Sequence, residues 1–515
     1  MSHMVQTNAS DVVDPRRWWI LGALCSVLLL VGLDLTILNV AVPVIGADLD
    51  ASAGQLQWIV NGYTVVLAAL LLPVGQLGDR FGRKRLLLLG LVVFGIASLL
   101  CAFAPTPGWL IAGRALLGVG AAFLNTLGLA VLVTVFPVKE RPKAIGIQAA
   151  AVSAGMPLGP IVGGFLLEHF AWGSVFLLNL PLVVIAFIAL AVLVRESRSE
   201  RPVRVDLTGG VLAVSALAIL SYGLITAGET SWTNGVAIAA IGVGLVLLAV
   251  FVIAQRLVHD PMADLSLFAE SRYTWGSILS TAVQFVVFGV MFIVPQYSYV
   301  VLGASPVEIG LHLLPLVAAM ILAIAVASRI RKAVGARAIM AAGFVALAAG
   351  LIIGALVDST SSFWVFALWT GLVGIGFGAA MPPALDIALA PVPSSRSGAG
   401  SALLQAQRQV GAILGVAIMG SVLALTYRAR LDTTAVPAEA LETVEHSAAS
   451  GKAVADQLGS ADLASAVSDA FTQGMTSSFW VAAVVSTACA IICVTFVRKN
   501  ADQAIDTDDT AVEAR

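Results

Sequence analysis

The hydrophobic positions of this chain form fourteen long runs, and polar residues are concentrated in the connections between them. The runs are close to or longer than the ~20 apolar residues with which an α-helix crosses the hydrocarbon core of a bilayer. One connection, 427–475, is long and polar, and we expect it to form an external loop with a short helix or two. The pattern predicts membrane-spanning helices at 18–45, 56–77, 86–104, 109–136, 145–168, 172–194, 207–227, 234–256, 274–301, 307–328, 337–357, 363–390, 401–426 and 476–497.

The composition agrees with an all-α membrane protein. Of 515 residues, 59% are hydrophobic and only 11% are charged, and the mean hydropathy is +0.97. A soluble domain carries about 25% charged residues. The net charge of −2 gives no sign of nucleic-acid binding. The loops contain no paired catalytic carboxylates, no His cluster and no G-x-x-x-x-G-K-[ST] phosphate loop. We therefore expect neither an enzyme nor an ATP-driven pump, and no metal or cofactor.

The basic residues of the short connections alternate from one connection to the next. Basic connections include those with Arg83 to Arg85 and with Arg195 and Arg198, whereas Asp48, Asp50 and Glu229 lie in or beside the connections between them. Cytoplasmic loops of membrane proteins carry the excess of Lys and Arg. This rule predicts that both polar tails, 1–17 and 498–515, lie in the cytoplasm.

Asp34 is the only charged residue in the run 18–45. A carboxylate in hydrocarbon costs several kcal/mol, so it must face a water-filled cavity, pair with a cation or carry a proton. All three possibilities indicate transport. Arg114, in the run 109–136, is a candidate partner, because a rise of ~1.5 Å per residue places both side chains in the outer half of the membrane. The alternative is that Arg114 extends its charge to the nearby interface.

Two glycine-rich segments stand out. The connection at 75–85 reads G-x-L-x-D-R-x-G-R-K and contains Gly75, Asp79, Arg80, Gly82 and Arg83. Its glycines permit a tight turn, although a simple basic turn would also explain its charges. The run 145–168 contains G-x-x-x-G-P-x-x-G-G, whose small residues favour close helix packing and whose prolines disfavour a straight helix. The residues of this second motif are Gly155, Gly159, Pro160, Gly163 and Gly164.

The C-terminal half has its own charged residues at membrane depth. We expect Asp386, in the run 363–390, to approach Arg408, in the run 401–426. Either a structural ion pair or a role in proton coupling would explain them. The sequence of the segment 328–335 weakly resembles that of the connection at 75–85, but it lacks an Asp.

Several other polar and aromatic residues lie within the apolar runs. They are candidates to line a substrate cavity, with the alternatives of bonding to a neighbouring helix or, for the aromatic rings, plain packing. These residues are Asn39, Asn61, Tyr63, Gln148, Gln284, Phe285 and Phe288.

Five motifs together resemble the fourteen-helix drug–proton antiporter branch of the major facilitator superfamily. They are the two glycine-rich segments, the Asp34 segment that continues to Pro43, Arg114 in R-x-x-x-G-x-G, and Trp172-x-x-x-Phe176-x-x-Asn179-x-Pro181. The resemblance implies two six-helix bundles, 18–194 and 274–497, with a cavity between them and an inserted helix pair at 207–256. It also implies a conformational latch at 75–85, a link between Arg114 and proton movement, and an antiporter signature at Gly155 to Gly164.

On this basis we expect a proton-driven exporter of amphiphilic, mainly cationic small molecules, acting as a monomer in the bilayer of a bacterial cytoplasmic membrane. Asp34 would bind the proton or the cation, with Arg114 as its partner. Because no second clear acid lies deep in the N-terminal half, we expect monocations to be preferred over dications. The alternatives are a dedicated exporter of one antibiotic, lipid or metabolite, and a nutrient symporter, which the motif at Gly155 to Gly164 disfavours.

Overall fold

The computed structural model describes residues 15–137, 140–198, 206–258, 261–357, 361–392, 397–437 and 440–496. The tail 498–515 and all but three residues of the tail 1–17 lie outside these ranges. Within them, all regular secondary structure is helical.

The N-terminal helices are long, except for one short turn before the last of them. Pro181 lies in the first turn of α7, where backbone N–H groups have no acceptor within the helix, so the missing N–H of proline costs no hydrogen bond. The elements are α1 (Arg17–Asp48), α2 (Ala53–Phe81), α3 (Arg83–Ala102), α4 (Pro107–Val135), α5 (Arg141–His169), α6 (Ser174–Leu177) and α7 (Asn179–Leu193).

The remaining elements begin with the inserted pair, α8 (Leu207–Glu229) and α9 (Gly235–Leu257). The run 307–328 is interrupted at Leu313, because Pro315 begins a new helix and cannot donate to the preceding turn. The other elements are η1 (Leu265–Ala269), α10 (Ser271–Val300), α11 (Pro306–His312), α12 (Leu314–Val334), α13 (Ala336–Ala355), α14 (Phe363–Leu389), α15 (Ser397–Arg430), η3 (Thr433–Ala435), α16 (Leu441–His446), α17 (Ala448–Leu458) and α18 (Ala461–Thr495).

Thirteen helical segments of the described chain are long and apolar enough to cross a membrane, with α6–α7 and α11–α12 each counting as one segment. The 29-residue helix α5, which packs along α1, covers the remaining predicted run. The predicted spans thus correspond to helices one by one. Several helices extend beyond their apolar runs, because polar residues at the membrane surface continue the helical turn.

The helices form two groups that meet along a few contacts. α1 to α7 pack mainly with one another, as do α10, α12 to α15 and α18, whereas α11 packs mainly against α5 of the other group. The groups touch through α2 with α15, α5 with α11, and α1 with α10. α8 packs against both α2 and α15, and α9 packs mainly against α8. The inserted pair therefore lies beside the junction of the two groups.

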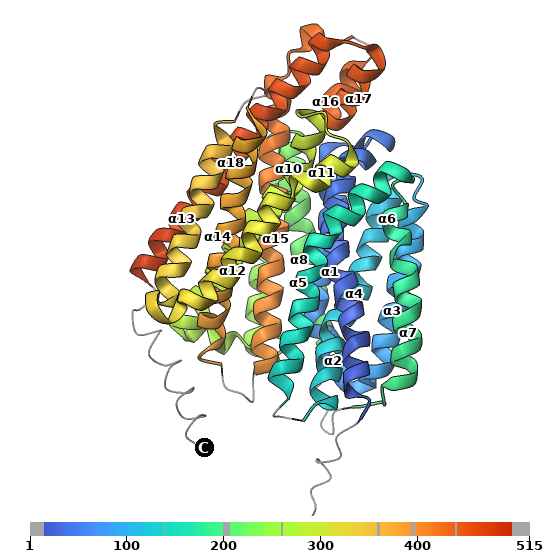
Figure 1. The fold of residues 1–515 in the computed structure, drawn as a ribbon, viewed down its shortest axis with the longest axis vertical. Helices are drawn as coiled ribbons and strands as arrows, with labels where there is room; N and C mark the ends of the chain where they lie inside the picture. Colours follow the sequence, from blue (N-terminus) through green and yellow to red (C-terminus); the bar gives the residue numbers. More distant parts are fainter. Residues whose placement is uncertain are drawn as a thin grey trace, which may run out of the picture.

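The two ends of the molecule differ (Figure 1). α16 and α17 lie at one end, which we call the cap end, whereas α1 begins and α18 ends at the opposite end, the terminal end. The connection 427–475 forms short helices as predicted, and the ends of α15 and α18 extend into it. The Tyr427 hydroxyl donates to the Val444 carbonyl oxygen at 2.8 Å and holds α16 against α15.

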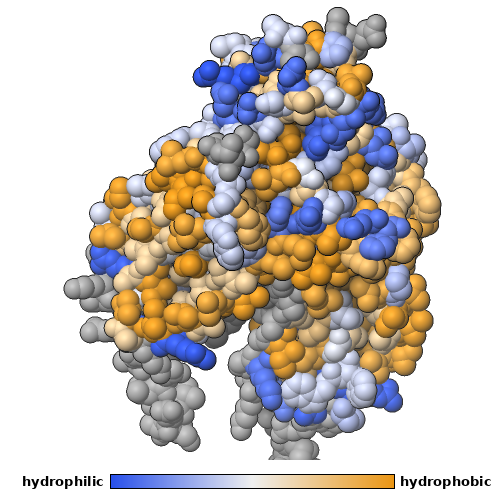
Figure 2. Space-filling view, turned by 45° about the horizontal axis from the view of Figure 1, so that its top comes forward, coloured by the Kyte–Doolittle hydropathy of each residue, from blue (hydrophilic) through white to orange (hydrophobic). Residues whose placement is uncertain are grey.

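The surface follows the same division. Figure 2 shows hydrophobic side chains over the flanks of the molecule and hydrophilic ones gathered at the cap end. On α9, large side chains such as Val243, Leu245 and Val246 are exposed on the outside of the molecule. A helix that exposes such residues is suited to lipid contact.

Candidate functional site

Asp34 and Arg114 form a buried ion pair between α1 and α4. The Arg114 Nη1 donates to the Asp34 Oδ2 at 2.8 Å, and the side chains of Arg114 and Asp34 are 2% and 1% exposed, respectively. The predicted contact is present, and Arg114 does not extend to the interface. Because both charges are fully removed from solvent, each depends on the other for compensation.

Three further groups complete this charge cluster. The Arg114 Nε donates to the Ile59 carbonyl oxygen at 3.1 Å, and its guanidinium lies 4.5 Å from the centre of the Tyr63 ring. The Asn179 amide donates to the Asp34 Oδ1 at 3.4 Å and to the Ser98 Oγ at 3.1 Å. Both oxygens of the Asp34 carboxylate therefore accept a hydrogen bond.

The structure changes the interpretation of two residues of this cluster. Tyr63, a candidate to line the substrate cavity, contacts the Arg114 guanidinium with its ring and is fully buried. Asn179 is part of a sequence motif, and the motif does not predict its bond to Asp34. An amide two residues before Pro181 inside an apolar run was the only sequence signal for it.

This arrangement limits what Asp34 can do in the conformation observed. Protonation of the carboxylate would leave the buried Arg114 charge unpaired, and breaking such a pair costs roughly 3–5 kcal/mol. A proton or a cationic ligand must therefore reach Asp34 together with a rearrangement of α1 against α4.

The glycines of α5 bring its backbone directly against the helix that carries Asp34. A Cβ on Gly155 would overlap the Leu29 carbonyl oxygen, and one on Gly159 would overlap the Thr36 hydroxyl. A Cβ on Gly163 would lie 2.8 Å from the Ile37 side chain. Gly155, Gly159 and Gly163 therefore form one contact face toward α1, as their spacing predicts.

The rest of the same motif contacts the C-terminal group. A Cβ on Gly164 would lie 2.7 Å from the Pro306 carbonyl oxygen, at the start of α11. A Cβ on Gly310 of α11 would in turn overlap the Pro160 carbonyl oxygen. The motif thus contacts both the helix of Asp34 and the opposite group of helices.

The segment expected to act as a latch is held within the N-terminal group. The Arg83 Nη2 donates to the Asp79 Oδ1 at 2.7 Å. Arg80 is exposed and lies over the neighbouring Phe81 ring. A Cβ on Gly75 would make only an ordinary 3.4 Å contact, so close packing does not require glycine at this position.

Glu196, which follows α7, contacts this segment, and the sequence pattern does not predict this contact. Its carboxylate accepts from the backbone N–H groups of Lys84 at 3.1 Å and Arg85 at 3.2 Å, so it caps the N-terminus of α3. Gly82 has a φ of +111°, and a Cβ there would lie 2.7 Å from the Glu196 carboxylate. Only glycine satisfies both conditions.

We expect Gly82→Ala to lower the free energy of unfolding by roughly 1–3 kcal/mol, because it strains the backbone and displaces the capping carboxylate. Thermal unfolding of purified protein in detergent measures the effect. Gly108→Ala is the control, since nothing lies within 4 Å of a Cβ at that position. Equal melting temperatures for the two variants would contradict this account of Gly82.

The predicted approach of Asp386 to Arg408 is wrong. Asp386 instead forms an ion pair with Arg331, and Arg408 donates to the Gln405 Oε1 at 2.9 Å. The reason is packing, because α14 lies along α12 and barely touches α15. The degenerate segment 328–335, which lacks its own Asp, thus obtains a carboxylate from α14.

A double-mutant cycle tests this assignment. We expect Asp386→Asn and Arg331→Gln to be non-additive in unfolding free energy by about 0.5–1 kcal/mol, because the pair is partly exposed. Asp386→Asn combined with Arg408→Gln should be additive. Coupling of Asp386 to Arg408 instead of Arg331 would refute the pairing described.

The remaining candidate cavity residues are all buried, as are Phe285 and Phe288. The Asn39 amide donates to the Leu35 carbonyl oxygen in its own helix, and the Asn61 amide donates to the Ile413 carbonyl oxygen across the two groups. For Asn61 the alternative of bonding to a neighbouring helix therefore holds in this conformation.

Other buried amides lack partners among the described residues. They include the Gln148 Nε2, the Gln284 Oε1, both amide atoms of Gln57, and the Oε1 atoms of Gln407 and Gln409. A buried polar group without a partner costs roughly 1–3 kcal/mol. Water, a substrate or a second conformation must supply their hydrogen bonds.

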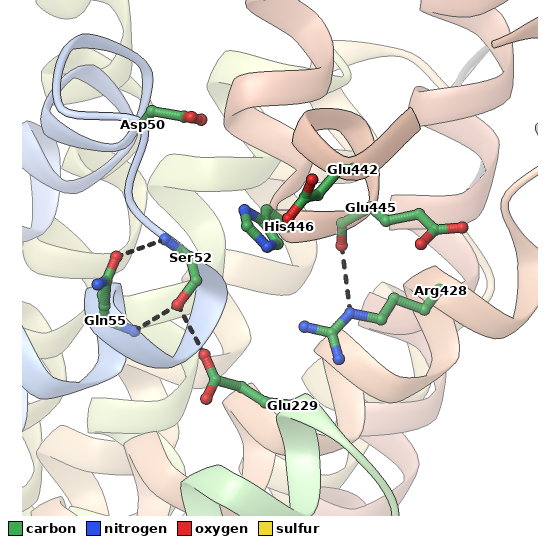
Figure 3. A pocket seen from close by; sticks show the side chains of 8 residues that line it. All are labelled: Asp50, Ser52, Gln55, Glu229, Arg428, Glu442, Glu445 and His446. Carbon is green, nitrogen blue, oxygen red and sulfur yellow. Dashed lines mark hydrogen bonds between the residues drawn. The ribbon is translucent and has the colours of Figure 1, made fainter. Parts of the chain in front are cut away.

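One pocket lies at the cap end, and its lining residues do not include Asp34. It has a volume of about 620 Å³. The Glu229 carboxylate at the end of α8 accepts from the Ser52 hydroxyl at 2.6 Å and ties α8 to the start of α2 (Figure 3). The lining residues are Asp50, Ser52, Gln55, Glu229, Arg428, Glu442, Glu445 and His446.

A family model described as the Major Facilitator Superfamily matches residues 24–416. The chain belongs to this superfamily. The expected all-α fold of the family is thereby confirmed, and the protein is a multi-pass membrane protein.

Curated relatives include transporters of known resistance phenotype. The multidrug efflux pump LfrA of Mycolicibacterium smegmatis is 35% identical over 97% of this chain and 100% of its own length. The methyl viologen resistance protein SmvA of Salmonella typhimurium is 34% identical over 85% of this chain and 89% of its own. The tetracenomycin C resistance and export protein of Streptomyces glaucescens is 32% identical over 82% of this chain and 79% of its own length.

Solved structures agree on the fold. A bacterial homolog of the human lysosomal transporter Spinster, in an inward-facing and unoccupied conformation, matches with a TM-score of 0.67 and 18% identity over 94% of this chain and 98% of that one. A D-xylose–proton symporter matches with a TM-score of 0.61 and 16% identity over the same shares. At these identities the likeness supports the fold alone.

Proposed function

We propose that this protein is a proton-coupled antiporter that exports amphiphilic, mainly cationic small molecules across a bacterial cytoplasmic membrane. The buried pair of Asp34 and Arg114 carries the proposal, because it places one titratable carboxylate at membrane depth beside a cation. Relatives named for multidrug efflux and for methyl viologen resistance support this substrate class.

In the proposed cycle, Asp34 takes a proton from the outside and its bond to Arg114 weakens. When the protein opens to the cytoplasm, the proton leaves and the free carboxylate attracts an organic cation. Proton and cation thus compete for one carboxylate, which couples their movements in opposite directions. One proton that enters in exchange for one monocation moves no net charge, so the pH gradient drives this exchange, with about 1.4 kcal/mol for each tenfold ratio of proton concentration.

The contacts around Asp34 suggest what each neighbour does. Arg114 stabilises the ionised carboxylate, and Asn179 holds its second oxygen. The glycine face of α5 lets α1 and α5 move as closely packed helices, and Gly164 transmits this movement to α11. With a single carboxylate in the cluster, we expect this chain to prefer monocations over dications, unlike its relative SmvA, which is named for the dication methyl viologen.

The proposed transporter has a defined orientation in the membrane. The cap end faces the outside and both tails face the cytoplasm, following the distribution of Lys and Arg. The protein acts as a carrier, not as an enzyme. It works as a monomer in the lipid bilayer, without a cofactor, and draws its energy from the proton gradient.

A dedicated exporter of one compound is the second candidate. The names of relatives for resistance to puromycin, methylenomycin A and tetracenomycin C favour it. A nutrient symporter is a weaker candidate, since the D-xylose symporter shares only the fold.

The deciding experiment measures proton movement in proteoliposomes with an imposed pH gradient. Addition of an organic monocation such as tetraphenylphosphonium should release protons from the acidic lumen if the protein is an antiporter. Proton uptake together with the cation would indicate symport. Absence of any response to a panel of cations, with a response to one antibiotic, would favour the dedicated exporter.

A further inference from the structure

A second pocket lies in the C-terminal group near the cap end, away from the Asp34 cluster in both sequence and helix membership. Its volume is about 230 Å³, and it is built from α10, α11, α14 and the end of the α13 segment. The residues of its wall that matter here are Tyr297, Glu308, His312, Phe363 and Phe366.

Four aromatic rings of this wall form one cluster. The His312 ring lies 5.3 Å from the Phe366 ring and 5.7 Å from the Phe363 ring, centre to centre. The Tyr297 ring stacks almost parallel to Phe366 at 6.0 Å. Phe363 is 50% exposed, so a large ring stands at the mouth of the pocket. Aromatic faces attract organic cations through the ring quadrupole.

A carboxylate without a Lys or Arg partner among the described residues lines the same pocket as these rings. Glu308 is exposed, and the backbone N–H of Ser305 donates to its Oε2 at 2.8 Å, which fixes the side chain in a capping box. In the part of the chain that the structure describes, no Lys or Arg forms an ion pair with Glu308. A fixed carboxylate next to ring faces is the arrangement that recognises ammonium groups.

We propose that this pocket binds the head group of a small quaternary ammonium ion, with Glu308 supplying charge and the rings of Phe363 and Phe366 supplying their faces. Sites for whole drug-sized ligands measure roughly 300–1,000 Å³, so about 230 Å³ suits a head group and not a complete dye. The ligand class rests on the proposed function, whereas the site is independent of Asp34.

The position of α11 connects this pocket to the transport machinery. Glu308 and His312 lie on the same seven-residue helix as Gly310, whose backbone rests on the Pro160 carbonyl of α5. A cation held between α11 and α14 therefore stabilises α11 where it contacts the glycine-rich motif. The pocket is a second, peripheral place for the same class of compound that the protein exports.

The test measures equilibrium binding of benzyltrimethylammonium to the full chain in lipid nanodiscs by isothermal titration calorimetry. All proteins carry Asp34→Asn, which removes the carboxylate of the proposed transport site. Binding should persist in this background and weaken at least about tenfold when Glu308→Gln or Phe363→Ala is added. Glu308→Gln keeps the helix cap, because Gln also completes a capping box.

Two controls make the result specific. Trp364→Ala removes a neighbouring ring that is 79% exposed and does not line the pocket, so it should leave binding unchanged. The neutral isostere of the ligand, in which carbon replaces the nitrogen, should bind at least about tenfold more weakly.

Loss of all binding in Asp34→Asn alone, or equal binding with and without Glu308→Gln, would overturn the proposal. Tight binding of the neutral isostere would also overturn it, because the rings would then form only an apolar packing site. The proposed function fails separately, through absence of cation-driven proton release in the unmodified protein, and such a failure leaves this binding result intact.

Discussion

Replacing Asp34 with Asn is expected to abolish proton-coupled export while leaving the protein in the membrane. The substitution removes the carboxylate for which proton and cation compete, and it leaves the buried Arg114 charge without its partner. Breaking such a pair costs roughly 3–5 kcal/mol, which corresponds to a factor of at least about 100 in an equilibrium. The measurement is cation-induced proton release in proteoliposomes.

A second pair of variants separates coupling from stability. Asp34→Asn with Arg114→Gln removes both charges, so it should recover much of the unfolding free energy that the single variant loses. It should not recover proton release. Asp34→Glu, which keeps a carboxylate at this position, should keep part of the cation-induced proton release.

Proton release at the level of the unmodified protein in Asp34→Asn would move the coupling elsewhere. Asp386 and Arg408 would then be the next carriers to test, although they do not pair with each other. In that event the buried pair of α1 and α4 would be a packing feature.

Replacing Gly159 with Val should be the most damaging single change in the glycine-rich motif. A Cβ at this position already overlaps the Thr36 hydroxyl, and the backbone nitrogen of Ile37 lies only 2.8 Å away. Overpacking costs typically 1–3 kcal/mol, and rigid backbone on the opposite helix leaves little room to relax. Separation of α1 from α5 would also shift the turn that carries Asp34.

Melting temperature and export rate should both fall for Gly159→Val. Gly22→Ala in α1 is the matched control, since nothing lies within 4 Å of a Cβ at that position. A Gly159→Val protein with normal melting and export would show that the close contact between α1 and α5 is dispensable.

Local sequence patterns determined much of this protein. A continuous apolar run of this length satisfies its backbone in a membrane as a helix, so run length predicted the spans. The cost of an isolated charge at membrane depth singled out Asp34 and required a partner, which Arg114 supplies. The spacing of Gly155, Gly159 and Gly163 likewise predicted one contact face.

Tertiary structure alone decided which distant side chains meet. Asp386 pairs with Arg331 and not with Arg408 because α14 packs along α12, and the depth of a residue in its own helix does not reveal which neighbour that helix has. For the same reason the sequence did not show that Asn179 bonds to Asp34 or that Glu196 caps α3. The hydrophobic pattern of a helix is visible in its own sequence. A hydrogen bond between two helices depends instead on how each helix is rotated relative to the other, and the packing of the whole bundle determines this rotation.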